Sequence, residues 1–420
     1  MKAFILAASL TVLLTAPLPA HGSGKLVLLV YRQDSERQLI SNVLSACGYE
    51  VKAVAKADYN AALLDGCHGM ATTVLAPYFD SLAAGIPVLC IGPMALPAGG
   101  IETQTANDPG GVLHIGNIQS PVHFTGRTLL IKSYKGVAVG EMEFALRARH
   151  PYGVIEDNAA FVPSFSLDDI QPLALAAVAR RLFHDPEQGR LFLLIDEVYP
   201  FSDLGMLCHM AEELNTRGYP FTLYAMPVYD NLEYPAFLRY AQVLRYIQFR
   251  GGAVVLHDPI IRAAEAEMES TAQRLQRARD AFTQQSILLA NGIVSPYRMT
   301  IGGFSNLSSQ AVPFGPLPMD VAVILPIAKT PQEFEKTLQL ISKKWVAVSS
   351  LLKMITSEPI LYNEQPAGDE YAYREEVQTS FKGFFSAGNE TLIIIVAVSL
   401  IFFSGLLIGG YFLYRRKFYR

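Results

Sequence analysis

The chain has 420 residues, of which 51% are hydrophobic and 17% charged, so it is long enough for two globular domains and too apolar for a disordered protein. Its 34 basic and 38 acidic residues give a net charge of -4, and no basic motif with interleaved aromatic residues occurs. Because a polyanion is attracted by a basic field, this balance excludes nucleic acid as an expected partner.

Residues 1–22 have the layout of a cleaved signal peptide. Lys2 precedes an apolar stretch over residues 3–16, and small residues follow around Ala20. We therefore expect the mature chain to lie outside the cytoplasm, where disulfides are permitted. No CxxC pair occurs, and Cys90 lies inside the apolar run IPVLCIG, so neither a disulfide nor a structural zinc site is required.

Residues 25–148 predict an α/β domain with a flavodoxin-like or amidotransferase-like parallel sheet. Continuous apolar runs alternate with helical patterns, which is typical of a parallel sheet covered on both faces. The strand candidates are KLVLLVY (25–31), YEVKAVA (49–55), GMATTVLA (69–76) and IPVLCIG (86–92). Residues 112–148 instead alternate apolar and polar positions and predict antiparallel strands that bridge to the next domain. No catalytic motif is evident in this domain.

Residues 149–189 are predicted as a linker and a helix starting near Asp168, and the βα rhythm then restarts over residues 190–356. The strand candidates of this second domain are LFLLIDEV (191–198), FTLYAMPV (221–228), AVVLHDP (253–259) and DVAVILPI (320–327). Helical patterns separate them, including a long amphipathic one over 261–290. Several βα units with polar residues at the carboxyl ends of strands predict an irregular (β/α) barrel with its chemistry at that rim.

The C-terminal part predicts a membrane anchor. Residues 357–391 are polar and acid-bearing, as expected of a stalk, and residues 392–414 form an uncharged run long enough to cross a hydrocarbon core of about 30 Å as a helix. The tail 415–420 is basic, which marks the cytoplasmic side of the membrane. We therefore expect a single-pass membrane protein with its N-terminal domains outside the cytoplasm.

Three segments of the second domain carry a resemblance to a known family: LFLLIDEVYPFSDL (191–204), YAMPVY (224–229) and GGAVVLHDP (251–259). Together they resemble the uncharacterised polysaccharide-deacetylase-like family, which is related to carbohydrate esterases, over residues 190–355. In active relatives the first strand ends in Asp-Asp, a general base and a metal ligand. The third ends in His-x-x-x-His, which completes the metal site, and a later Pro-His segment lines the substrate pocket.

The resemblance assigns roles to residues of this chain. It implies Asp196 as the base, and Glu197 and His257 as ligands of a divalent metal such as zinc, which would polarise the amide carbonyl. Pro296 and Tyr297 match the Pro-His segment. The second histidine falls at Ile261, which cannot bind a metal. We also expect substrate contacts from Tyr199 and Tyr229, because aromatic residues at such a rim can stack on sugar rings.

Two functional interpretations follow. The preferred one is a catalytically degenerate protein without a cofactor that binds a glycan, or acts as a scaffold beside polysaccharide-synthesis proteins, in exopolysaccharide or cell-envelope metabolism. The alternative is an active deacetylase of N-acetylated polysaccharide with zinc on Glu197 and His257.

Simpler roles also remain open. Asp196 and Glu197 could accept hydrogen bonds from loop amides, Ser202 or Asp203 could cap the next helix, and His257 could be a core histidine. The N-terminal sheet could also be the functional part and recruit a partner for a synthase complex.

Overall fold

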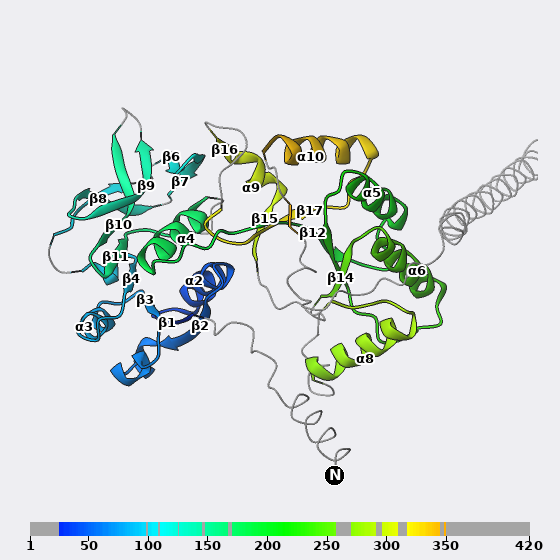
Figure 1. Cartoon of the computed structure of the whole chain (residues 1–420), viewed down its shortest axis with the longest axis horizontal. Helices are drawn as coiled ribbons and strands as arrows, with labels where there is room; N and C mark the ends of the chain where they lie inside the picture. Colours follow the sequence, from blue (N-terminus) through cyan, green and yellow to red (C-terminus); the bar gives the residue numbers. More distant parts are fainter. Residues whose placement is uncertain are drawn as a thin grey trace, which may run out of the picture. The chain divides into compact units, whose positions relative to one another are not determined.

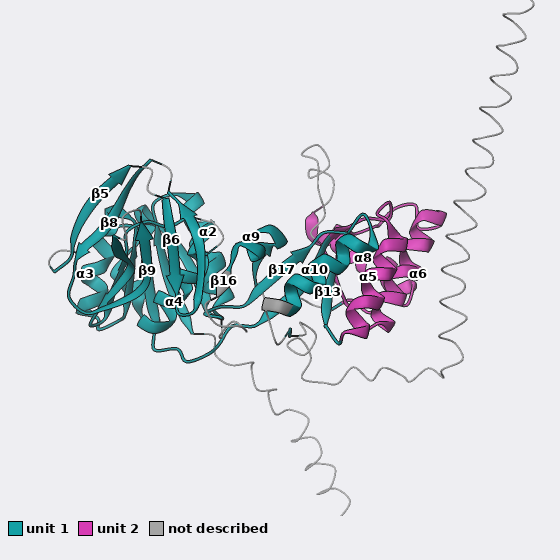
Figure 2. Ribbon diagram, turned by 90° about the horizontal axis from the view of Figure 1, so that it is seen from above, with its two compact units in different colours: residues 1–196, 218–223, 290–355 teal, residues 197–217, 224–289, 356–420 magenta. Residues whose placement is uncertain are grey.

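The computed structural model describes residues 25–97, 100–107, 110–124, 126–144, 148–166, 170–257, 270–290, 296–309, 317–344 and 348–349. The chain divides into two compact units (Figure 2). Unit 1 comprises residues 1–196, 218–223 and 290–355, and unit 2 comprises residues 197–217, 224–289 and 356–420. The predicted signal peptide, stalk, membrane span and tail lie outside the described residues, as does Ile261. Within the described residues no helix has the length and apolar character needed to cross a membrane.

Unit 1 contains a ten-stranded sheet with the order β16-β7-β6-β9-β10-β11-β4-β3-β1-β2 (Figure 1). Its strands are β1 (Leu26–Tyr31), β2 (Glu50–Ala55), β3 (Gly69–Thr72), β4 (Val88–Ile91), β6 (Gly110–Ile115), β7 (Ile118–His123), β9 (Val137–Phe144), β10 (Arg149–Glu156), β11 (Ala159–Val162) and β16 (Ser308–Ser309). A separate two-stranded sheet pairs β5 (Glu102–Asn107) with β8 (Arg127–Ser133).

Half of the large sheet is parallel. β1 pairs in parallel with β2 and β3, β3 with β4, and β4 with β11. The resulting order, β2-β1-β3-β4-β11, is that of a flavodoxin-like doubly wound sheet. The central strand β1 is buried from Val27 to Val30, which explains why its sequence is apolar without alternation. The predicted parallel α/β layer is therefore confirmed.

The other half of the sheet is antiparallel. β10 pairs with β11 and β9, and β6 pairs with β9 and β7, all in antiparallel register. The segment 149–162, which was predicted to be part of a linker, thus supplies β10 and β11. Pro151 within β10 obscured this strand in the sequence, because proline lacks the amide proton of a ladder residue.

The helices of this part are α2 (Asp34–Ala46), α3 (Ala76–Ala83) and α4 (Gln171–Leu182), and short 3-10 turns follow β2 and β4. Almost every residue of α4 is buried, including Arg180. A helix that is buried on all sides lies inside the unit and does not coat its surface.

A chain of polar contacts ties α4 to distant segments of unit 1. Asp185 accepts from Lys25 Nζ at 2.9 Å and from Arg180 Nη1 at 3.0 Å. Arg180 also donates to the carbonyl oxygens of Cys47, at 3.0 Å, and Pro318. These bonds join the start of β1, the end of α2 and the approach to β17.

A second sheet has five strands in the order β14-β13-β12-β17-β15. The strands are β12 (Leu191–Val198), β13 (Phe221–Ala225), β14 (Ala253–Leu256), β15 (Tyr297–Thr300) and β17 (Val321–Leu325). β12 and β15 both pair with β17 in parallel. Among the described residues no pairing joins β14 to β15, so the parallel sheet is confirmed and its closure into an irregular (β/α) barrel stays a prediction.

The helices associated with these strands are α5 (Leu204–Thr216), α6 (Pro235–Phe249) and α8 (Thr271–Gln284) in unit 2, and α9 (Ile301–Asn306) and α10 (Pro331–Lys344) in unit 1. α8 begins later than the predicted helix over 261–290. Ser270 is its N-cap: the Ser270 hydroxyl accepts from the Gln273 amide at 3.3 Å, and the Gln273 side chain accepts from the Ser270 amide at 3.0 Å. This reciprocal capping fixes the start of α8.

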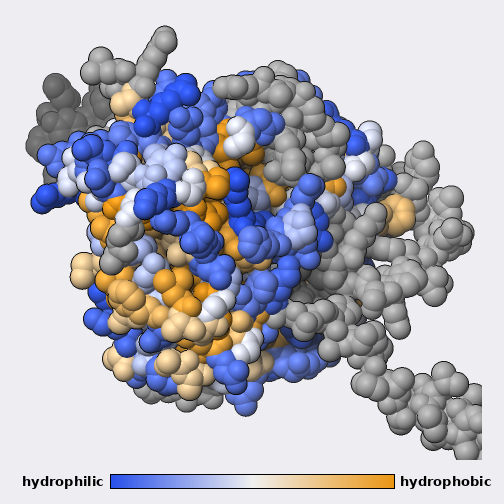
Figure 3. Space-filling model, turned by 60° about the vertical axis from the view of Figure 1, so that its left-hand side comes forward, coloured by the Kyte–Doolittle hydropathy of each residue, from blue (hydrophilic) through white to orange (hydrophobic). Residues whose placement is uncertain are grey.

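Apolar side chains remain exposed on unit 1. Figure 3 shows one face of the molecule, on which apolar residues, in orange, gather in the lower part among polar residues. The exposed fractions of Phe79, Leu82 and Met94 are 53%, 40% and 58%. Phe79 and Leu82 belong to α3, so this short helix has an apolar side that the sheet does not cover.

Candidate functional site

The carboxyl ends of β12, β13 and β14 lie side by side within unit 2. The Met226 amide donates to the Val198 carbonyl at 2.9 Å, and the His257 amide donates to the Ala225 carbonyl at 2.9 Å. The buried hydroxyl of Tyr240, on α6, also donates to the Val198 carbonyl, at 2.6 Å. Backbone hydrogen bonds therefore join the three strand ends at the predicted rim, and the Tyr240 hydrogen bond attaches α6 to it.

Glu197 occupies an unusual backbone conformation at this rim. Its φ is 50°, in the left-handed region that costs about 1–2 kcal/mol for a residue with a Cβ. Val198, which follows it, is fully buried and Asp196, which precedes it, is half-buried, whereas Glu197 is exposed. Strain of this kind is concentrated at functional sites, so the conformation marks Glu197 as a candidate.

His257 lies against an aromatic ring. Its imidazole centroid is 6.3 Å from that of Tyr224, with the rings at 78° to each other, and the His257 side chain is half-buried. This edge-to-face contact fixes the imidazole next to the end of β13.

Asp196 pairs with an arginine within unit 1. Its Oδ2 accepts from Arg298 Nη1 at 2.9 Å, with the two side chains 15% and 42% exposed. Arg298 lies on β15, next to Tyr297, whose amide donates to the Asp320 carbonyl at 2.8 Å. Pro296 and Tyr297 are half-buried. The sequence analysis did not identify Arg298, although it directly follows Pro296 and Tyr297, which the resemblance assigns to the substrate pocket.

The described residues do not form a metal site. No group of three or more His, Cys, Asp or Glu side chains converges among them. A catalytic zinc generally uses three protein ligands, and the sequence prediction supplied only Glu197 and His257. The assignment of Glu197 and His257 as ligands stays a prediction.

The loops that follow β12 and β13 present exposed aromatic side chains. Phe201 is 86% exposed, and Tyr234 is 56% exposed. The β12–α5 loop is tightly turned: the Tyr199 amide donates to the Ser202 hydroxyl at 3.0 Å, and Asp203 caps α5 by accepting from the Met206 amide at 2.8 Å. The predicted helix-capping role of Asp203 is confirmed, and the loop that carries Phe201 is held at both ends.

Tyr229 lies under two arginines of α8. The guanidinium carbons of Arg274 and Arg277 are 5.8 Å and 5.1 Å from the centre of its ring. Arg274 Nη1 also contacts the Tyr229 hydroxyl at 3.4 Å, and Arg277 pairs with Asp230 at 3.2 Å. The spacing of three residues on one helix puts both arginines on one face, which is the signal that could have identified them.

Comparison with known proteins does not assign the chain to a family. No protein-family model and no curated protein matches the chain. Among solved structures, the carbohydrate deacetylase Agd3 is 11% identical with a TM-score of 0.34, covering 65% of this chain and 62% of that one. The β-galactosidase from Rahnella sp. R3 is 15% identical with a TM-score of 0.29, covering 44% of this chain and 36% of that one.

A putative GMP synthase protein from Thermoplasma acidophilum is 13% identical with a TM-score of 0.23, covering 39% of this chain and 95% of that one. The chain is thus a weak structural neighbour of a carbohydrate deacetylase, and it spans less than two thirds of that protein's length.

Proposed function

We propose that this chain is a glycan-binding protein in which the rim of unit 2 holds the sugar. The observation that carries the proposal is the pair of exposed aromatic side chains, Phe201 and Tyr234, on the loops after two strands whose ends are hydrogen-bonded to each other. Leaving aromatic surface in water forgoes about 25 cal/mol for each Å². Rings held out on anchored loops are suited to stack on the C–H faces of sugar rings.

Polar groups at the same rim can bind sugar hydroxyls. The exposed Glu197 carboxylate offers acceptors, and the cluster of Tyr229, Asp230 and Arg277 offers donors and acceptors on partly exposed side chains. The combination of aromatic faces with a few fixed polar groups is that of a carbohydrate site.

In this proposal the catalytic part is degenerate. The resemblance assigns the base role to Asp196, whose carboxylate is bound by Arg298. A charged carboxylate can accept a proton, but amide hydrolysis also needs an electrophile on the carbonyl. The resemblance leaves the second metal histidine at Ile261, so we assign this chain binding without hydrolysis.

We further propose that residues 392–414 anchor the protein in the membrane, with the glycan-binding part outside the cytoplasm. That placement rests on the signal-like residues 1–22 and the basic tail. It would bring the rim to extracellular polysaccharide and to the proteins that make it.

Calorimetric titration of the purified full chain tests the binding proposal. The ligands are β-linked hexamers of N-acetylglucosamine, glucosamine and glucose. Phe201→Ala and Tyr234→Ala should each weaken binding about fivefold, since one aromatic contact contributes roughly 1 kcal/mol. Phe249→Ala is the matched control, because Phe249 is 48% exposed at the other end of α6. Failure to bind any hexamer, or equal affinities for all three variants, would contradict the proposal.

An active deacetylase is the second candidate, favoured by the Asp196–Arg298 pair, which holds a carboxylate next to a fixed positive charge. It requires about one zinc per chain and acetate release from the N-acetylglucosamine hexamer. Asp196→Asn should abolish that release, and Asp280→Asn, which alters an exposed aspartate of α8, should not. Metal analysis and acetate assay of both variants decide between a binding protein and an enzyme.

A further inference from the structure

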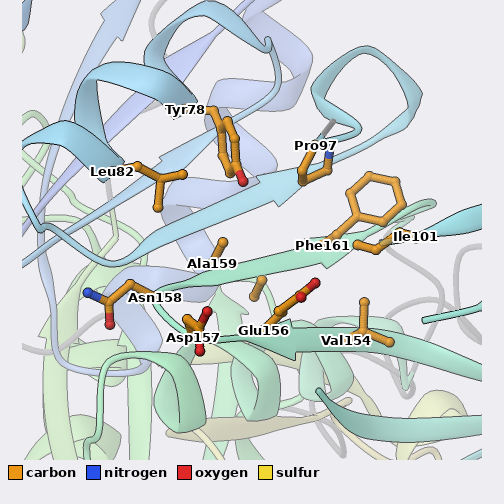
Figure 4. A pocket seen from close by; sticks show the side chains of 11 residues that line it. Tyr78, Leu82, Pro97, Ile101, Val154, Glu156, Asp157, Asn158, Ala159 and Phe161 are labelled. Carbon is orange, nitrogen blue, oxygen red and sulfur yellow. The ribbon is translucent and has the colours of Figure 1, made fainter. Parts of the chain in front are cut away.

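We propose that unit 1 has a separate small-molecule site, in the pocket between α3 and strands β10 and β11, and that it takes an amine-bearing sugar of monosaccharide size. The pocket has a volume of about 400 Å³ and is lined by side chains of both acidic and apolar character (Figure 4). Ligand pockets usually have volumes of roughly 300–1,000 Å³. The site lies wholly in unit 1 and does not depend on the loops of unit 2.

The strand register explains the floor of the pocket. Val154 faces Phe161 and Glu156 faces Ala159 across the β10–β11 pair. Because side chains alternate along a strand, these four side chains lie on one face of the sheet. Ala159 is the smallest of them, and its methyl group opposite the longer Glu156 side chain leaves space above the sheet.

The wall of the pocket comes from α3. Tyr78 and Leu82 are one helical turn apart and both line the pocket. In Figure 4 the Tyr78 hydroxyl points into the space between the helix and the strands, and Glu156 directs its carboxylate into the same space from below. Leu82 is 40% exposed, so this wall is apolar and open to solvent.

The pocket carries negative charge that the described residues do not neutralise. Glu156 lines it, and Asp157 follows in the turn to β11 with a φ of 49°. Neither carboxylate has an ion-pair partner in the part of the chain that the structure describes. Burial raises the pKa of the Tyr78 phenol, and Cys90 and Glu156 act in the same direction, so the phenol stays protonated and can donate.

These features select the ligand chemistry. A protonated amine compensates the Glu156 carboxylate, whereas a phosphate or a carboxylate would be repelled by it. The Tyr78 hydroxyl and the Asn158 amide can bind hydroxyl groups, and the Leu82 and Ile101 side chains can cover the C–H face of a ring. A wholly apolar ligand would bury Glu156 without a partner. An amino sugar provides a protonated amine for Glu156, hydroxyl groups for Tyr78 and Asn158, and a C–H face for Leu82 and Ile101.

Calorimetric titration at pH 7 tests this proposal. The purified full chain is titrated with glucosamine, N-acetylglucosamine and glucose. Glucosamine should bind about tenfold more tightly than the two neutral sugars, because a hydrogen bond to a charged group contributes roughly 1.5 kcal/mol or more. Glu156→Gln should remove that preference, and Ala159→Leu should weaken all binding by filling the hollow. Glu50→Gln, the same change on the exposed edge strand β2, should bind as the unaltered chain does.

Absence of saturable glucosamine binding would overturn the proposal, as would equal affinity for the three sugars or an affinity that Glu156→Gln and Ala159→Leu leave unchanged. Thermal unfolding of each variant checks that it is folded. Phe201→Ala should keep its glucosamine affinity at this pocket. Loss of hexamer binding at the unit 2 rim and loss of glucosamine binding here are therefore separate outcomes.

Discussion

Asp185 is the anion on which the buried polar chain of unit 1 converges, so Asp185→Asn tests how strongly that chain holds the unit together. The side chains of Asp185 and Arg180 are 2% and 9% exposed, and removing one partner of a buried ion pair costs about 3–5 kcal/mol. Arg180 keeps the Cys47 and Pro318 carbonyls as acceptors. Lys25 is 38% exposed, so water solvates its ammonium group when the carboxylate is lost, and the loss of this ion pair contributes little to the destabilisation. The free energy of unfolding of unit 1 should therefore fall by about 3 kcal/mol, the lower end of that range.

Hydrogen exchange under increasing urea measures this change on peptides of β1 and α4, which report unit 1 alone. The matched control is Asp34→Asn, because Asp34 is 81% exposed and its contact with Arg37 is 3.5 Å long. That variant should stay within about 0.5 kcal/mol of the unaltered chain. Equal stability of the two variants would refute the reasoning that burial makes the Asp185 contacts strong.

The same network predicts a pH dependence. Burial acts to raise the pKa of Asp185, but the bonds from Lys25 and the Glu187 amide, together with the charge of Arg180, outweigh it and lower the pKa. A lowered carboxyl pKa contributes stability that is complete above the unfolded value, about 3.9, and is lost as the pH falls through the folded value. Unit 1 should therefore lose stability below about pH 4, and Asp185→Asn should flatten that decline.

Three further predictions concern the rim and the thiols. Tyr240→Phe removes the 2.6 Å hydrogen bond to the Val198 carbonyl, although that carbonyl still accepts from the Met226 amide. The free energy of unfolding in urea should therefore fall by about 1 kcal/mol, and unchanged stability would contradict the role of this bond. Glu197→Gly should be more stable than Glu197→Ala by about 1 kcal/mol, because only glycine adopts a φ of 50° without strain, and the reverse order would exclude the strain. Burial raises the pKa of Cys47 and Cys90 to about 12, so few of these thiols are ionised at pH 8. Iodoacetamide at pH 8, followed by mass spectrometry, should therefore label the half-buried Cys67 before them, and early labelling of Cys90 would disprove its burial.

The parallel half of the large sheet could be predicted from the sequence, because strands buried on both faces have continuous apolar runs such as LVLLV in β1. The cap of α5 was predictable for a similarly local reason, since Asp203 lies just before the apolar start of the helix. Both signals are contained in a few consecutive residues.

The missed features depend on residues far apart in the chain. The Asp196–Arg298 pair joins positions separated by 102 residues, and the unit 1 pocket depends on the register that puts Ala159 opposite Glu156. β15 is only four residues long and shows no clear alternation. The left-handed conformation of Glu197 leaves no trace in residue type, because glycine is the residue that usually marks it.

The two-residue strand β16 bonds to β7 at one edge of the ten-stranded sheet, although Ser308 and its partner Gln119 lie far apart in the chain. The unit 2 segments 197–217 and 224–289 are translated before the last segment of unit 1, so unit 1 cannot be completed while the ribosome is still making them. Until then Ile118 and Gln119 at the β7 edge lack their β16 partners, and an unpaired edge can pair with another nascent chain. Biogenesis of this protein should therefore be sensitive to chaperone supply and to the pace of elongation through residues 197–289.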